Sequence, residues 1–181
     1  MPTSGERPST RRIALFIALA SLFQAMETVL ASPLPWFRLG LANALVLSAM
    51  VLYGFGPGMR VALGKVLLGS LITGKLFTPG FFLAFGGTLA SSFAMGAALP
   101  LPFGFMGLSV LGAAAHSAAE IAIARYAVLA TPAVWALMPV VGLVSVASGI
   151  LTGLAAAWLT RVAAETEEKR IPEIQNDTGG L

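Results

Sequence analysis

The feature that most constrains this chain is a succession of apolar stretches, each close to the length that crosses a bilayer. Proline- and glycine-containing breaks separate the stretches, and a helix does not continue easily through such breaks. This pattern predicts helical spans at residues 13–31, 39–55, 59–73, 81–99, 107–129 and 133–160.

The composition supports the same fold class. Hydrophobic residues make up 57% of the 181 residues, charged residues only 10%, and the mean hydropathy is +0.86. A water-soluble domain could hardly bury so much apolar surface inside itself, so lipid must cover the excess. The sequence therefore predicts an all-α integral membrane protein with about six transmembrane helices.

The termini and charges predict the organisation around these spans. Residues 1–10 have no apolar face and are expected to form a flexible tail, residues 11–161 the transmembrane domain, and residues 162–181 a polar tail in which a helix end precedes disorder. A cleaved signal peptide is the alternative for the first span, but Gln24 and Glu27 interrupt its apolar region.

Basic residues predict the orientation. An even number of spans puts both termini on one side, and seven basic residues then lie on that side against three on the other. The positive-inside rule therefore predicts a multi-pass protein of the plasma (cell inner) membrane with both termini in the cytoplasm. The first group is Arg7, Arg11, Arg12, Arg60, Arg161, Lys169 and Arg170; the second is Arg38, Lys75 and Arg125.

Four ionisable residues lie deep within the predicted spans: Glu27, Lys65, His116 and Glu120. Each costs at least about 2.5–3.5 kcal/mol at the bilayer centre, so we expect all four to face the bundle interior or water. His116 and Glu120 are four residues apart and therefore share one helix face, which Ser109 and Gly112 extend. That face is small and polar, unlike a face that contacts lipid.

These residues admit two interpretations. Glu27 or Glu120 could simply pair with Lys65 and hold the helices together without any ligand. The whole set is more polar than a small bundle needs, and a cavity that receives a polar or charged substrate accounts for more of it. We predict a pocket lined by the first, second, third and fifth spans, with substrate-binding residues Glu27, Arg38, Asn43, Lys65, His116 and Glu120, of which Arg38 and Asn43 lie near the mouth.

The charge of the substrate stays open. Arg38 and Lys65 would favour an anionic group such as phosphate or carboxylate, whereas Glu27 and Glu120 would favour a cationic or hydroxylated one.

Several chemistries lack the residues they need. The chain has no cysteine and a single histidine, so neither thiolate chemistry nor a multi-histidine metal site is expected, although His116, Glu120 and Glu27 could supply three ligands. Lys65 and Lys75 each follow a glycine but precede no serine or threonine, so no ATP-binding Walker site is predicted. We predict no enzymatic activity, no catalytic residue, no metal and no cofactor.

Small residues recur at the spacing that lets helices approach closely. In the sixth span, Ser145, Gly149 and Gly153 predict packing within the bundle. In the first span, Ala14 and Ala18 predict either such packing or the docking of another membrane protein.

A combination of motifs resembles a known family. The chain carries Glu27, then a proline-containing loop, then Arg38 and the run LGLAN at 39–43, and later the pattern G-x-S-x-x-G-A-x-x-H at 107–116. Over residues 12–158 it resembles the Gx transporter family, which is also labelled heptaprenyl diphosphate synthase component I. Three positions differ from that family's usual residues: Ser117 replaces asparagine, Glu120 replaces glutamine, and Lys65 replaces arginine.

The family is similar in architecture to the substrate-binding (S) components of energy-coupling factor transporters. Those six-helix proteins capture vitamins or related small molecules from outside and dock onto a membrane coupling protein with two ATPases. The resemblance implies an S-component-like bundle, with Ala14 and Ala18 as the docking motif, and does not identify the ligand.

Together, the residues and the resemblance predict a membrane subunit that binds a small molecule for uptake and draws energy from a separate ATPase module. Two alternatives remain. One, implied by the family label, is a membrane partner of a heptaprenyl diphosphate synthase. It would be non-catalytic, because Asp177 is the sole aspartate and paired aspartates for magnesium are lacking. The other is a proton-coupled carrier that uses Glu27 or Glu120 as its proton site.

Overall fold

The structure is a computed structural model that describes residues 9–30, 40–128 and 132–178. In these ranges the chain forms six α-helices, a short π-helical segment and a short 3₁₀ segment, with no strand. The elements are α1 Thr10–Leu30, α2 Leu41–Tyr53, α3 Phe55–Ile72, α4 Pro79–Ala98, α5 Phe105–Ile123, η1 Ala124–Val128, η2 Pro132–Leu137 and α6 Met138–Thr178.

The prediction of an all-α membrane bundle is confirmed. Five stretches of helix are long and apolar enough to cross a membrane: Thr10–Val29, Phe55–Ile72, Pro79–Ala98, Phe105–Ala127 and Trp135–Ala163. The expected second span is shorter than predicted, because α2 has only 13 residues and rises about 20 Å, against a hydrocarbon core of about 30 Å.

Two glycines bound α2. Gly40 precedes it with φ 75° and Gly54 follows it with φ 89°, a left-handed backbone region that glycine enters without steric cost. A side chain at Gly40 would also collide with the Thr152 hydroxyl of α6. Most of α2 is buried by its neighbours, so it does not need the length of a lipid-exposed helix.

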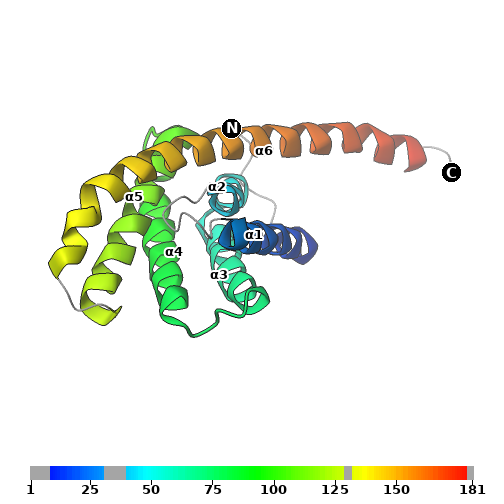
Figure 1. Cartoon of the computed structure of the whole chain (residues 1–181). Coiled ribbons are helices and arrows are strands. Elements are labelled where there is room, and N and C mark those ends of the chain that lie inside the picture. Colours follow the sequence, from blue (N-terminus) through cyan, green and yellow to red (C-terminus); the bar gives the residue numbers. More distant parts are fainter. Residues whose placement is uncertain (1–8, 31–39, 129–131, 179–181) are drawn as a thin grey trace.

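The helices close into a ring. Packing contacts join α1 to α3, α3 to α4, α4 to α5, α5 to α6, α6 to α2 and α2 back to α1, and α2 also packs on α3 (Figure 1). In Figure 1, α3, α4 and α5 run side by side, and α6 starts beside α5, crosses the bundle past α2 and extends beyond it toward the C-terminus. Apolar side chains fill the space inside the ring at one end of the bundle, and a cavity occupies the other end.

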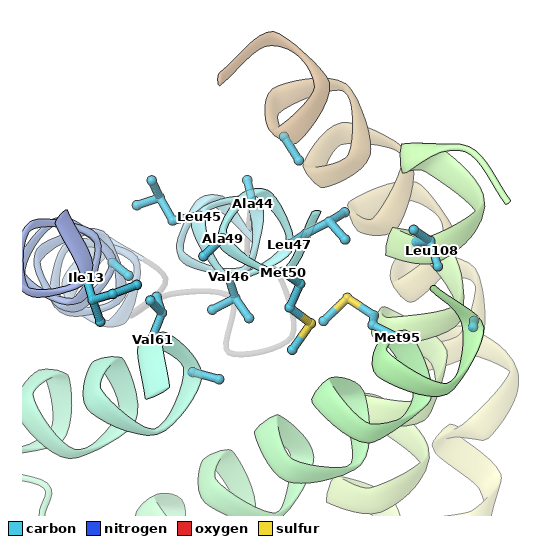
Figure 2. Close-up of a cluster of buried hydrophobic side chains, with 14 residues drawn as sticks. Ile13, Ala44, Leu45, Val46, Leu47, Ala49, Met50, Val61, Met95 and Leu108 are labelled. Atoms are coloured by element: carbon cyan, nitrogen blue, oxygen red, sulfur yellow. The ribbon is translucent and has the colours of Figure 1, made fainter. Parts of the chain in front are cut away.

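The filled end is a compact apolar core around α2. Leu47 and Met50 of α2 are almost fully buried, as is Val61 of α3, and Met95 of α4 points toward Met50 (Figure 2). Ile13 of α1, Leu108 of α5 and Ala156 of α6 complete this cluster. The residues from α1, α3 and α5 come from the first half of each helix and Met95 from the second half of α4, so the apolar contacts gather around α2.

Close contact between α5 and α6 depends on glycine. A Cβ at Gly149 would lie 2.7 Å from Cα of Val110, and one at Gly153 would lie 2.7 Å from Cα of Met106. The packing role predicted for the small residues of the sixth span is therefore confirmed. Ala14 and Ala18 of α1 are instead exposed, so their docking role remains a prediction.

The last helix is longer than its apolar span. Helix α6 continues through the charged segment to Thr178, whereas a helix end followed by disorder is expected from the composition. The domain boundaries and the orientation in the membrane remain predictions.

Glycine packing predicts opposite effects at two positions of α6. Gly149→Ala should lower stability by about 1–3 kcal/mol, because its methyl group meets the α5 backbone, which cannot move aside cheaply. Gly142→Ala is the matched control: nothing lies within 4 Å of its Cβ, and alanine favours helix. Thermal unfolding in mild detergent should show a lower Tm for the first variant only. Equal shifts would contradict the close α5–α6 contact.

Candidate functional site

The hollow end of the bundle contains a cavity of about 420 Å³. It lies where α1 and α3 end, where α2 and α4 begin, and between the second half of α5 and the first half of α6. It reaches the exposed residues Lys75 and Leu137. All six helices contribute to its wall, so α4 and α6 add to the four spans that the sequence predicts.

Glu27 joins the end of α1 to the start of α2. Its Oε1 accepts a hydrogen bond of 2.7 Å from the backbone N–H of Leu41, the first residue of α2. The first N–H groups of a helix have no partner within it, and a carboxylate at this position also interacts favourably with the helix dipole. The Thr152 hydroxyl donates to the carbonyl of the neighbouring Gly40, at 3.3 Å, and ties this junction to α6.

Lys65 places a cation inside the bundle. It lies midway along α3, its residue is only 3% exposed, and its Nζ donates a hydrogen bond to Oδ1 of Asn43 on α2. Burying an ammonium group is costly unless polar partners surround it. The Lys65–Asn43 pair therefore both links two helices and presents a charged group at the wall of the cavity.

His116 and Glu120 form a pair on the α5 wall. His116 Nε2 lies 3.2 Å from Oε1 of Glu120, one helical turn along. The imidazole packs directly on α4, because a Cβ at Gly87 would meet three of its ring atoms at 2.8–2.9 Å. The buried Nδ1 of His116 has no hydrogen-bond partner among the described residues.

Hydroxyl groups continue the polar surface onto α6. The Ser117 and Ser145 oxygens lie 2.5 Å apart, and Ser145 also donates to the Val141 carbonyl at 2.7 Å. These contacts hold α5 against α6 beside His116 and Glu120. Ser117 thus makes a contact between helices.

Phe81 and its neighbours Leu83 and Ala84 form an apolar wall at the start of α4. Thr78 caps this helix by accepting from the N–H of Phe81 at 3.3 Å, and Pro79 occupies its first position. Phe81 is buried at the cavity and stacks on Phe85 with 5.6 Å between ring centroids. The cavity therefore has one apolar wall facing its polar groups.

Five of the six predicted substrate-binding residues line this one cavity: Glu27, Asn43, Lys65, His116 and Glu120. The sixth, Arg38, lies outside the described residues. Ser109 and Gly112, predicted on the same face as His116, are buried but do not line the cavity, and Gly112 packs against Met95 and Ser91 of α4. The geometry agrees with the predicted clustering; binding itself remains a prediction.

Two residues of the site were not among the predicted substrate-binding residues. Lys75 lines the cavity, although its position at the end of a span favours interfacial snorkelling over attraction of an anion. Gly87 supports the His116 ring, and no local pattern identifies it, because the contact joins α4 to α5.

The arrangement suits binding by hydrogen bonds and charge. Its wall combines acidic, basic, amide, imidazole and hydroxyl groups with an aromatic surface, as small-molecule pockets commonly do. Among the described residues, no three histidine, cysteine, aspartate or glutamate side chains lie close enough together to hold a metal ion.

Comparison with known families agrees with this architecture. The model of the family described as heptaprenyl diphosphate synthase component I matches residues 16–159, about four fifths of the chain. The chain belongs to this component I family. No curated protein and no solved structure matches it. The family resemblance read from the motifs is thus confirmed, and the matched range contains the whole cavity wall and, apart from Ile13, the apolar core.

The Glu27 contact predicts a graded effect on stability. Glu27→Ala should cost about 1–2 kcal/mol, because the N–H of Leu41 loses its acceptor at a helix start. Glu27→Gln retains an oxygen in the same place and should lose less. Tm values in detergent would measure both effects. Equal losses in the two variants would mean that the charge, and not the hydrogen bond, stabilises this junction.

Proposed function

We propose that this component I family member is a substrate-binding membrane subunit for the uptake of a small molecule. The observation that carries the proposal is the cavity of about 420 Å³ at the hollow end of the bundle, where ionisable groups from α1, α3 and α5 converge. Its volume lies within the range of about 300–1,000 Å³ that is usual for small-molecule sites.

Apolar side chains inside a bundle of this size would stabilise it without the desolvation cost of charged groups. Each charged group at membrane depth must be offset by partners, and evolution retains such groups chiefly where they act on a ligand or an ion. The core around Leu47 and Met50 shows that this chain can fill the space between helices with apolar side chains. The polar lining at the other end therefore supports a ligand site.

Uptake would need an energy source. The sequence has no Walker motif, so we propose that a separate ATP-hydrolysing module drives release of the substrate. The exposed Ala14 and Ala18 on α1 are small residues one turn apart, where a helix of a coupling protein could approach closely, and exposed leucines such as Leu15 and Leu22 flank them.

The test is purification of the tagged full-length protein in gentle detergent, with mass spectrometry of the bound small molecules and proteins. Lys65→Met removes the buried charge while keeping a side chain of similar length. Arg60→Met makes the same change at an exposed position of the same helix, outside the cavity. A compound bound to the wild type should fall at least about tenfold in the first variant, as expected for loss of a charged hydrogen bond, and persist in the second.

A second candidate rests on the family description, which names a component of a heptaprenyl diphosphate synthase. In that case the chain would be a non-catalytic membrane partner, and the same purification would recover a soluble aspartate-rich synthase with no small molecule. Recovery of an ATPase module would favour the uptake subunit. A protein that purifies alone and empty would contradict both, and would favour a proton-coupled carrier based on Glu27 or Glu120.

A further inference from the structure

A second hollow adjoins the cavity on the outside of the bundle. It lies between the last turn of α1 and the end of α3, and its lining is mostly apolar: Ala25, Met26, Thr28, Val29, Ile72, Thr73 and Lys75. Val29 is 69% exposed and Ile72 is 63% exposed, while Ala25 between the two helices is buried. The feature is therefore a groove with a small residue at its floor and apolar side chains along its edges.

The groove and the cavity meet at shared residues. Thr28 of α1, Thr73 at the end of α3 and Lys75 in the following turn line both of them. The two threonine hydroxyls donate to carbonyls of their own helices, at 2.7 Å to Gln24 and 2.9 Å to Gly69. Of the three residues that line both the cavity and the groove, only Lys75 carries a charge.

The charges at this junction favour an anion. Each cavity carboxylate already has a contact inside the bundle, Glu27 with the N–H of Leu41 and Glu120 with His116. Lys75 is exposed where the cavity opens into the groove, and Lys65 lies deeper in the cavity on the preceding helix. A phosphate or carboxylate in the cavity would find two ammonium groups at its wall, those of Lys75 and of Lys65, which also donates to Asn43.

From this geometry we propose that the ligand is an anionic amphiphile, whose polar head occupies the cavity and whose apolar chain leaves through the groove between α1 and α3. This inference rests on the proposed function, because it assumes that the cavity binds a molecule. The groove opens among apolar side chains of two candidate membrane-spanning helices, so a hydrocarbon chain there would exchange protein contacts for lipid contacts without entering water.

The experiment measures binding of inorganic phosphate, methyl phosphate and octyl phosphate to the full-length protein in phosphatidylcholine nanodiscs. Binding to empty nanodiscs is subtracted, so that partitioning of the octyl chain into lipid is not counted. Octyl phosphate should bind at least about tenfold more tightly than methyl phosphate, because part of its chain contacts the groove. Octyl phosphate thus represents an anion attached to a lipid-like chain, and the other two represent a free anion.

Two variants test the path of the chain. Ala25→Phe fills the floor of the groove and should remove the advantage of the octyl chain while leaving methyl phosphate binding unchanged. Ile72→Trp obstructs the exposed edge of the groove, where packing does not resist a larger side chain, and should reduce the same advantage. Ala114→Phe is the control, because Ala114 is exposed on α5 and lines neither space.

Three results would overturn the inference. Equal affinities for methyl and octyl phosphate would indicate a compact anionic ligand and leave the proposed function standing. An octyl advantage that survives both groove variants would place the chain elsewhere. If none of the three phosphates binds while a bound compound still copurifies with the wild type, the proposal of an anionic head group is wrong. Absence of any copurified compound would instead count against the proposed function itself.

Discussion

The structure depends on the cost of placing polar groups within an apolar bundle in a membrane. Such groups are tolerated only where each finds a partner, and the contacts found here join separate helices or successive turns. Glu27 connects α1 to α2, Lys65 connects α3 to α2, and His116 pairs with Glu120 along α5. The same contacts that offset the free-energy cost of burying these polar groups also hold their side chains at the wall of one cavity.

The two ends of the bundle use different means of packing. At the filled end, α2 is surrounded on several sides and its apolar side chains interdigitate with those of its neighbours. At the hollow end, glycines allow close approach without filling the interior, as where the His116 ring lies against Gly87. A rigid filled end beside an open polar end is a suitable frame for a binding site, because the helices that form the cavity are held by contacts outside it.

The cavity contains both acidic and basic groups, and the position of each group determines which partner it already has. From the composition alone, two carboxylates and a lysine leave the ligand's charge undecided. The structure separates them: one carboxylate caps a helix, the other contacts an imidazole, and Lys75 stands where the cavity meets an apolar groove. These positions are the basis on which an anionic ligand is proposed.

The sequence by itself determined the fold class, the approximate spans and the set of deep polar residues, because hydropathy and the cost of burying charge act locally along the chain. It also indicated that His116 and Glu120 share a face, since helical spacing is a local property. Only the tertiary structure decided that α2 is a short buried helix, that Glu27 serves its first turn, that Gly87 supports His116, and that Lys75 belongs to the cavity. Those features arise where helices distant in sequence meet, and no local pattern of apolar and polar residues specifies which of them will touch.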